Sequence, residues 1–158
     1  MLIPLLIGCA TVFITMAIQI AAVVRMLKYL FRIVARKKNG ISSSQSTTYV
    51  ISSIMTMLFL AHLFQVGVWA VLFMQVGEFS DFQTAFYHSM VNFASLGYGD
   101  IVMSEHWRIL GSIEACAGVL MFGVSAGAML SIMSFILTHD VRLKALVSEL
   151  KKQNTRNA

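Results

Sequence analysis

The chain has 158 residues, of which 58% are hydrophobic and only 12% charged, and its mean hydropathy is +0.77. This composition excludes an ordinary soluble domain and indicates a membrane protein. The net charge of +5 does not indicate a nucleic-acid partner. Almost all basic residues lie in two clusters beside apolar segments, where lysine and arginine mark the cytoplasmic side of a membrane.

Three apolar segments, residues 1–24, 50–77 and 108–138, are long enough to cross a bilayer, for which a helix needs about 20 apolar residues. The first segment has no basic n-region and no small-residue cleavage site. We therefore expect it to be an extra N-terminal transmembrane helix and not a secretory signal. Cys9 and Cys116 lie inside apolar segments, which favours buried packing residues over a disulfide.

Residues 25–48 form a basic segment followed by a polar linker, NGISSSQSTT. The first four charges step by three, four and four residues, which keeps them on one face of a helix: Arg25, Lys28, Arg32 and Arg36. A voltage-sensing helix steps strictly by three. The pattern therefore favours an amphipathic helix lying on the cytoplasmic surface of the membrane.

The second basic cluster lies in the tail, residues 139–158. Since both clusters favour the cytoplasmic side, an even number of crossings must separate them. Residues 82–94 have a helical pattern but are too short to cross, which predicts a re-entrant helix that lines a pore or cavity. The N-terminus would then lie outside a cell membrane and the C-terminus in the cytoplasm.

The tail carries leucines at helical spacing between its basic residues. We expect a short cytoplasmic helix, and four such helices would suit a bundle below the pore. The tail is too short for a ligand-sensing domain, so regulation would come from the membrane, pH, ions or an unknown regulatory partner.

The stretch SLGYG, residues 95–99, places two glycines around a tyrosine. A filter for dehydrated cations needs successive carbonyls that point the same way, and residues with a Cβ resist the required backbone angles. Gly97 and Gly99 meet this need. One chain supplies only one wall of such a filter, so we expect a homotetramer with closed symmetry.

The sequence AFYHSMVNFASLGYGD, residues 85–100, resembles the pore helix and selectivity filter of the potassium channel superfamily. The resemblance covers about residues 50–138 and implies K⁺ as the permeant ion, with no cofactor. The residues implied to hold K⁺ are Ser95, Leu96, Gly97 and Tyr98, through their carbonyls and the Ser95 hydroxyl, with Gly99 completing the filter.

Two further groups are candidates for supporting the filter. The resemblance implies that Tyr87 touches Asp100, the acid after the filter. Glu114 lies inside a spanning segment, where an acid is costly and needs a partner. We expect it behind the filter, bonded to Asn92 or Ser89; the alternative is a carboxylate that reaches water at the membrane interface.

Several other polar residues have more than one interpretation. We expect His62 and Gln65 to form hydrogen bonds with the first or third spanning helix, and proton sensing by His62 is the alternative. Glu78, Asp81, Asp100 and Glu105 fall on the predicted outer side. They would either enrich cations at the pore mouth or be ordinary loop charges, and Asp81 or Ser80 is a candidate helix cap.

Glycines punctuate the third spanning segment. Gly118 lies near the position of the family's hinge glycine, and Gly123 is a second hinge candidate. Close helix packing is the alternative for both, with Gly123 and Gly127 forming a small-xxx-small pair.

These observations predict an all-α membrane protein with three transmembrane helices, a re-entrant pore helix and a filter. We expect a passive potassium-selective channel embedded in the lipid bilayer. Ser95, Leu96 and Ala94 depart from the family's usual filter residues, so a weakly selective cation channel is one alternative. A non-conducting accessory subunit is another, and the lack of any catalytic constellation disfavours an enzyme.

Overall fold

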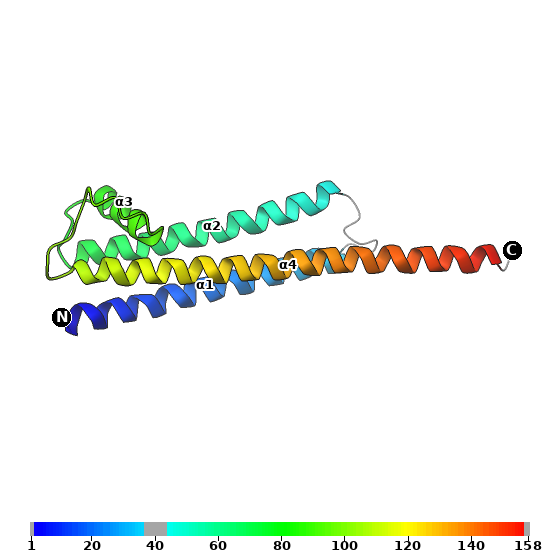
Figure 1. The fold of residues 1–158 in the computed structure, drawn as a ribbon, viewed down its shortest axis with the longest axis horizontal. Helices are drawn as coiled ribbons and strands as arrows, with labels where there is room; N and C mark the ends of the chain where they lie inside the picture. Colours follow the sequence, from blue (N-terminus) through cyan, green and yellow to red (C-terminus); the bar gives the residue numbers. More distant parts are fainter. Residues whose placement is uncertain (1, 37–43, 157–158) are drawn as a thin grey trace.

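The computed structural model describes the backbone of residues 2–36 and 44–156, and the side chains of residues 2–33 and 48–138. Within these ranges the chain is entirely helical apart from its loops. The helices are α1 (Leu2–Arg36), α2 (Ser44–Gln75), α3 (Phe82–Phe93) and α4 (Arg108–Arg156) (Figure 1). The predicted all-α class is confirmed.

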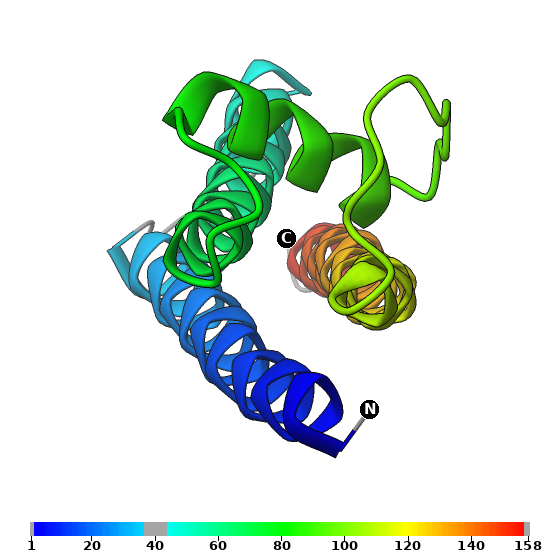
Figure 2. The same cartoon turned by 90° about the vertical axis from the view of Figure 1, so that its left-hand side faces the viewer.

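Three of the helices are long and apolar enough to cross a membrane, over Leu2–Ile33, Thr48–Gln75 and Arg108–Thr138. They lie side by side, with α2 antiparallel to α1 and α4 (Figure 1). The short α3 packs against α2 and α4 at the end where α1 begins (Figures 1 and 2). The expected plan of three spans and one short helix is therefore present.

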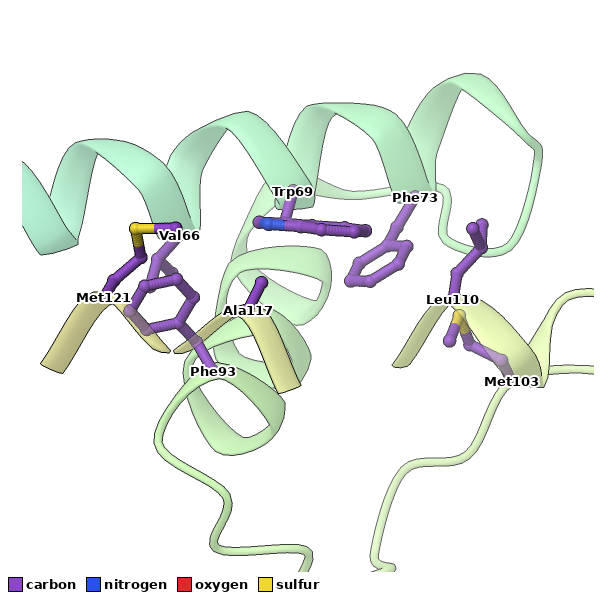
Figure 3. Close-up of a cluster of buried hydrophobic side chains, with 8 residues drawn as sticks. All are labelled: Val66, Trp69, Phe73, Phe93, Met103, Leu110, Ala117 and Met121. Carbon is purple, nitrogen blue, oxygen red and sulfur yellow. The ribbon is translucent and has the colours of Figure 1, made fainter. Parts of the chain in front are cut away.

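Two apolar clusters hold the bundle together. The cluster nearer α3 is shown in Figure 3 and consists of Val66, Trp69, Phe73, Phe93, Met103, Leu110, Ala117 and Met121. The other consists of Met26, Leu30, Val50, Ile54, Leu58, Ile132 and Ile136. The first fastens α3 to the two helices beneath it, and the second joins α1, α2 and α4 at the opposite end.

The basic segment after residue 24 differs from the expected surface helix. It continues α1 without a break to Arg36, and Met26 and Leu30 are 0% and 2% exposed in the second apolar cluster. An apolar stripe fits a groove between helices as well as it fits a membrane surface. In this structure the apolar stripe packs between α2 and α4.

The expected linker is also shorter than predicted, because α2 begins at Ser44. Helix α4 continues past residue 138 to Arg156, so the tail is the end of α4 and not a separate helix. The side chains that would form a tail bundle lie outside the described residues. Cys9 and Cys116 are free thiols, as predicted, but they are exposed on the chain surface and not buried.

Helix α3 begins at a defined cap. The backbone N–H of Thr84 donates to Asp81 Oδ1 at 2.8 Å, so Asp81, and not Ser80, is the cap that the sequence left open. This backbone hydrogen bond lowers the pKa of Asp81. The helix ends at Phe93, one residue before the predicted end, and the chain passes directly into residues 95–99.

Candidate functional site

The backbone of residues 95–99 alternates in handedness. The φ angles are 57° at Ser95, 59° at Gly97 and 73° at Gly99, whereas the intervening Leu96 and Tyr98 are not among the described residues with positive φ. Alternating left- and right-handed residues turn successive peptide planes so that their carbonyls face one side. This is the backbone pattern that a row of carbonyl ligands requires.

Ser95 is the only described residue other than glycine with a positive φ. Its Cβ makes this conformation cost roughly 1–2 kcal/mol. Such strain persists only where the surroundings hold it in place, and it gathers at functional sites. The strained serine therefore marks residues 95–99 as a site more sharply than the glycines alone do.

The same segment has little contact with the rest of its own chain. Leu96 and Tyr98 are 53% and 65% exposed, and a Cβ added at Gly97 or Gly99 would meet nothing within 4 Å. The glycines are therefore needed for their backbone angles and not for space. Most of the surface of this segment is thus left uncovered by its own chain.

Asp100 is fastened to α3 directly after the segment. The Tyr87 hydroxyl donates to Asp100 Oδ2 at 2.7 Å, so the two residues touch as the resemblance implied. The hydrogen bond lowers the pKa of Asp100 and raises the pKa of Tyr87. The ionised carboxylate and the neutral phenol thus stabilise one another at neutral pH.

His88 forms a second connection that the sequence alone did not predict. Its Nδ1 lies 3.1 Å from the carbonyl oxygen of Ile101 and its Nε2 lies 2.9 Å from Asn92 Nδ2. A carbonyl can only accept and an amide NH₂ can only donate, so the ring is neutral with its proton on Nδ1. Burial lowers the pKa of His88, which favours the same neutral form. The sequence offered one signal for this contact: His88 follows Tyr87, which was expected to touch Asp100 after the filter segment.

Glu114 lies behind this loop, on α4. It is 0% exposed, and its Oε1 lies 2.5 Å from Ser89 Oγ. The expected bond to α3 is present, and burial rules out a carboxylate that reaches water. The Ser89 hydroxyl also donates to the Val66 carbonyl at 2.9 Å. One hydroxyl proton serves one acceptor, so a proton on the Glu114 carboxyl is needed for both bonds to form.

Small residues of α4 let α3 approach closely. A Cβ at Gly118 would overlap the backbone carbonyl of Phe93, and one at Gly111 would lie 2.9 Å from Asn92 Nδ2. Gly118 therefore has a packing role, and its role as a hinge remains a prediction. A Cβ at Gly123 would meet nothing within 4 Å, so the structure assigns that glycine no contact in the single chain.

The loop that follows the segment is also tied to the turn before α3. Glu78 accepts from the Ser104 backbone N–H at 2.7 Å and from the Ser104 hydroxyl at 2.5 Å. This carboxylate therefore links two loops of the chain. Within the described residues, no group of three or more His, Cys, Asp or Glu side chains could hold a metal ion.

A second cluster of buried polar side chains lies between the three long helices. Gln65 donates to Gln19 Oε1 at 2.8 Å, Gln19 donates to Ser125 Oγ at 2.7 Å, and His62 Nε2 lies 3.0 Å from the same hydroxyl. The expected bonds of His62 and Gln65 to the first and third spans are therefore present. Gln19 and Ser125 were missed, and the available signal was a glutamine inside an apolar span.

Comparison with known proteins supports the plan that the geometry suggests. A family model described as ion channel matches residues 49–135, which is more than half of the chain and takes in most of α2, all of α3, residues 95–99 and most of the spanning part of α4. No curated protein and no solved structure matches the chain. Helix α1 lies outside the matched residues. The chain belongs to this ion channel family, within the potassium channel superfamily.

Proposed function

We propose that the protein is a passive potassium-selective channel whose filter is the segment Ser95–Gly99 contributed by each of four copies. The observation that carries the proposal is the alternating sign of φ at Ser95, Gly97 and Gly99. A partly dehydrated K⁺ would exchange its water for the carbonyls of residues 95–98 and the Ser95 hydroxyl. Several ions in a row would then hop between neighbouring carbonyl cages.

The exposure of residues 94–100 supports the homotetramer. A filter wall open on one side needs partner walls, and closed four-fold symmetry supplies them. Tyr87, His88 and Glu78 hold the flanks of the segment from within one chain. Each subunit would therefore bring a braced wall to the axis, and assembly would complete the cages.

We place the end of the bundle that carries α3 outside a cell membrane and the basic end in the cytoplasm. Arg25, Lys28 and Arg32 lie at the end of α1 away from α3, and basic residues favour the cytoplasmic side. The acidic residues Glu78, Asp81 and Asp100 lie at the α3 end. This distribution of charge supports the proposed orientation and would favour cations at the outer end.

The direct test is ion flux through the purified protein in liposomes, with potassium and sodium gradients compared. Gly97→Ala places a Cβ on a backbone at φ 59°, so we expect the flux to be abolished without a steric clash. Gly67→Ala is the matched control, because Gly67 lies in a helix and an added Cβ would make only an ordinary contact at 4.0 Å.

Each outcome decides between named alternatives. Flux of potassium alone, lost in Gly97→Ala and kept in Gly67→Ala, supports the proposal. Equal flux of both ions means that Ser95, Leu96 and Ala94 give a weakly selective cation pore. If neither gradient drives flux through any variant, although four-subunit assemblies form, the chain is a non-conducting subunit.

A further inference from the structure

The seam between α1 and α2 is hollowed by a long apolar groove on the outer face of the bundle. Its larger part has a volume of 790 Å³, within the range of about 300–1,000 Å³ that ligand sites occupy. A second hollow of 600 Å³ continues the seam toward Phe82 and shares Ile14 and Phe64 with the first. The groove thus follows the two helices over much of their spanning length.

Small side chains explain why the seam does not close. Four alanines of the two helices line the larger part, and we name them the alanine floor: Ala17, Ala21, Ala22 and Ala61. The larger residues Ile14, Leu60 and Phe64 line it as well. An apolar groove lined by methyl groups suits a hydrocarbon chain.

The groove ends at a positive charge. Among the residues that the structure describes, Arg25 is the only charged one that lines the groove, and the sequences of α1 and α2 contain no acidic residue. Arg25 is 23 residues from Leu2, roughly 35 Å at about 1.5 Å per residue, compared with a hydrocarbon core of about 30 Å. The guanidinium therefore lies at the depth of lipid headgroups.

We propose that this groove binds an anionic phospholipid, with one acyl chain along the alanine floor and the phosphate on Arg25. A guanidinium matches phosphate with paired hydrogen bonds, and Arg25 is the exposed cation that lines the end of the groove. The occupant combines a hydrocarbon chain with a negative group at one end, as the groove combines an apolar floor with a positive end.

A second copy of the chain fits this groove less well. The residues that line it come from α1, α2 and Phe82, with none from α4 or from residues 95–99. Figure 2 shows the loop after α3 on the α4 side of the bundle, away from α1. Copies arranged around the proposed filter would meet on that side, so the groove would face lipid.

The test is native mass spectrometry of the delipidated full-length protein, titrated with phosphatidylglycerol or phosphatidylcholine. We expect one phosphatidylglycerol per chain, bound at least about tenfold more tightly than phosphatidylcholine, since one charge-assisted contact is worth about 1.4 kcal/mol or more. Arg25→Gln should remove this preference. Lys28→Gln is the matched control, because it removes the same charge from a residue outside the groove and should leave the preference intact.

A second variant tests the apolar part. Ala21→Trp fills the floor, and we expect it to weaken binding of both lipids; Ala17→Leu is a milder filling variant if the first does not fold. Equal losses in Arg25→Gln and Lys28→Gln would overturn the proposal in favour of diffuse surface charge. Unchanged lipid binding in both filling variants would overturn it as well, and loss of subunit assembly in them would assign the groove to a second copy.

Discussion

Two clusters of buried polar side chains join the helices of the molecule by hydrogen bonds. One lies between α3 and α4, and the other lies among α1, α2 and α4. In the first, Glu114 and Ser89 join α4 to α3. In the second, Gln19, Gln65 and Ser125 join the extra helix to the other two. Polar groups in a spanning helix need partners because lipid offers none. The first cluster holds α3, which leads into the proposed filter, against α4, and the second attaches a helix that the family match does not cover.

Removing the carboxyl of the first cluster should have the largest effect. Glu114→Ala leaves a cavity and deprives Ser89 of a partner, and we expect a loss of about 3 kcal/mol in the stability of the assembled protein. Glu114→Gln keeps the shape and a donor for Ser89, so it should cost less than about 1 kcal/mol. Thermal dissociation of the purified oligomer measures both. Equal losses would mean that the carboxyl contributes charge and not a hydrogen bond.

Two glycines allow the contact of α4 with α3 to be compared with its contact with α1. Gly118 lies at the first contact and Gly8 at the second. Gly118→Ala would press a methyl group into the Phe93 carbonyl, whereas Gly8→Ala would meet the end of the Ile113 side chain at 2.7 Å. Backbone cannot yield as a side chain can, so we expect about 2 kcal/mol lost at Gly118 and less than about 1 kcal/mol at Gly8. Thermal dissociation and potassium flux should fall together for Gly118→Ala. A variant with normal stability and altered gating would favour the hinge role instead.

Breaking the second cluster should cost less than breaking the first. Gln19→Leu removes one bond to Gln65 and one to Ser125, and hydrogen bonds between spanning helices average about 0.6 kcal/mol. We therefore expect a loss of about 1 kcal/mol, measured by thermal dissociation. Gln75→Leu is the control, because Gln75 is exposed at the end of α2. If Gln19→Leu changes flux without changing stability, α1 acts on the pore and is not merely attached to it.

The sequence predicted the first cluster better than the second for physical reasons. An acid inside a spanning helix limits its environment strongly, and the resemblance placed α3 beside it, so Ser89 was a foreseeable partner. Ser125 is 106 residues from Gln19, and nothing in the local pattern brings them together. Met26 and Leu30 show the same limit, since a one-sided apolar stripe does not say whether lipid or another helix covers it.

The smallest effect concerns the exposed pair that follows the proposed filter. Tyr87 lowers the pKa of Asp100 through its hydrogen bond, so Tyr87→Phe should raise that pKa toward its usual value of about 3.9. A carboxyl with a lowered pKa stabilises the folded protein above its usual pKa and loses that contribution as the pH falls through the lowered value. The raised pKa of Tyr87 adds stability that is lost only as the pH rises past its own value. Thermal stability of Tyr87→Phe should therefore fall below that of the unmodified protein between about pH 5 and 9 and approach it in stronger acid.

Asp100→Asn should give a similar loss, and the double variant should lose little more than either single one. A deficit that persisted unchanged at low pH would assign Tyr87 a packing role without the carboxylate.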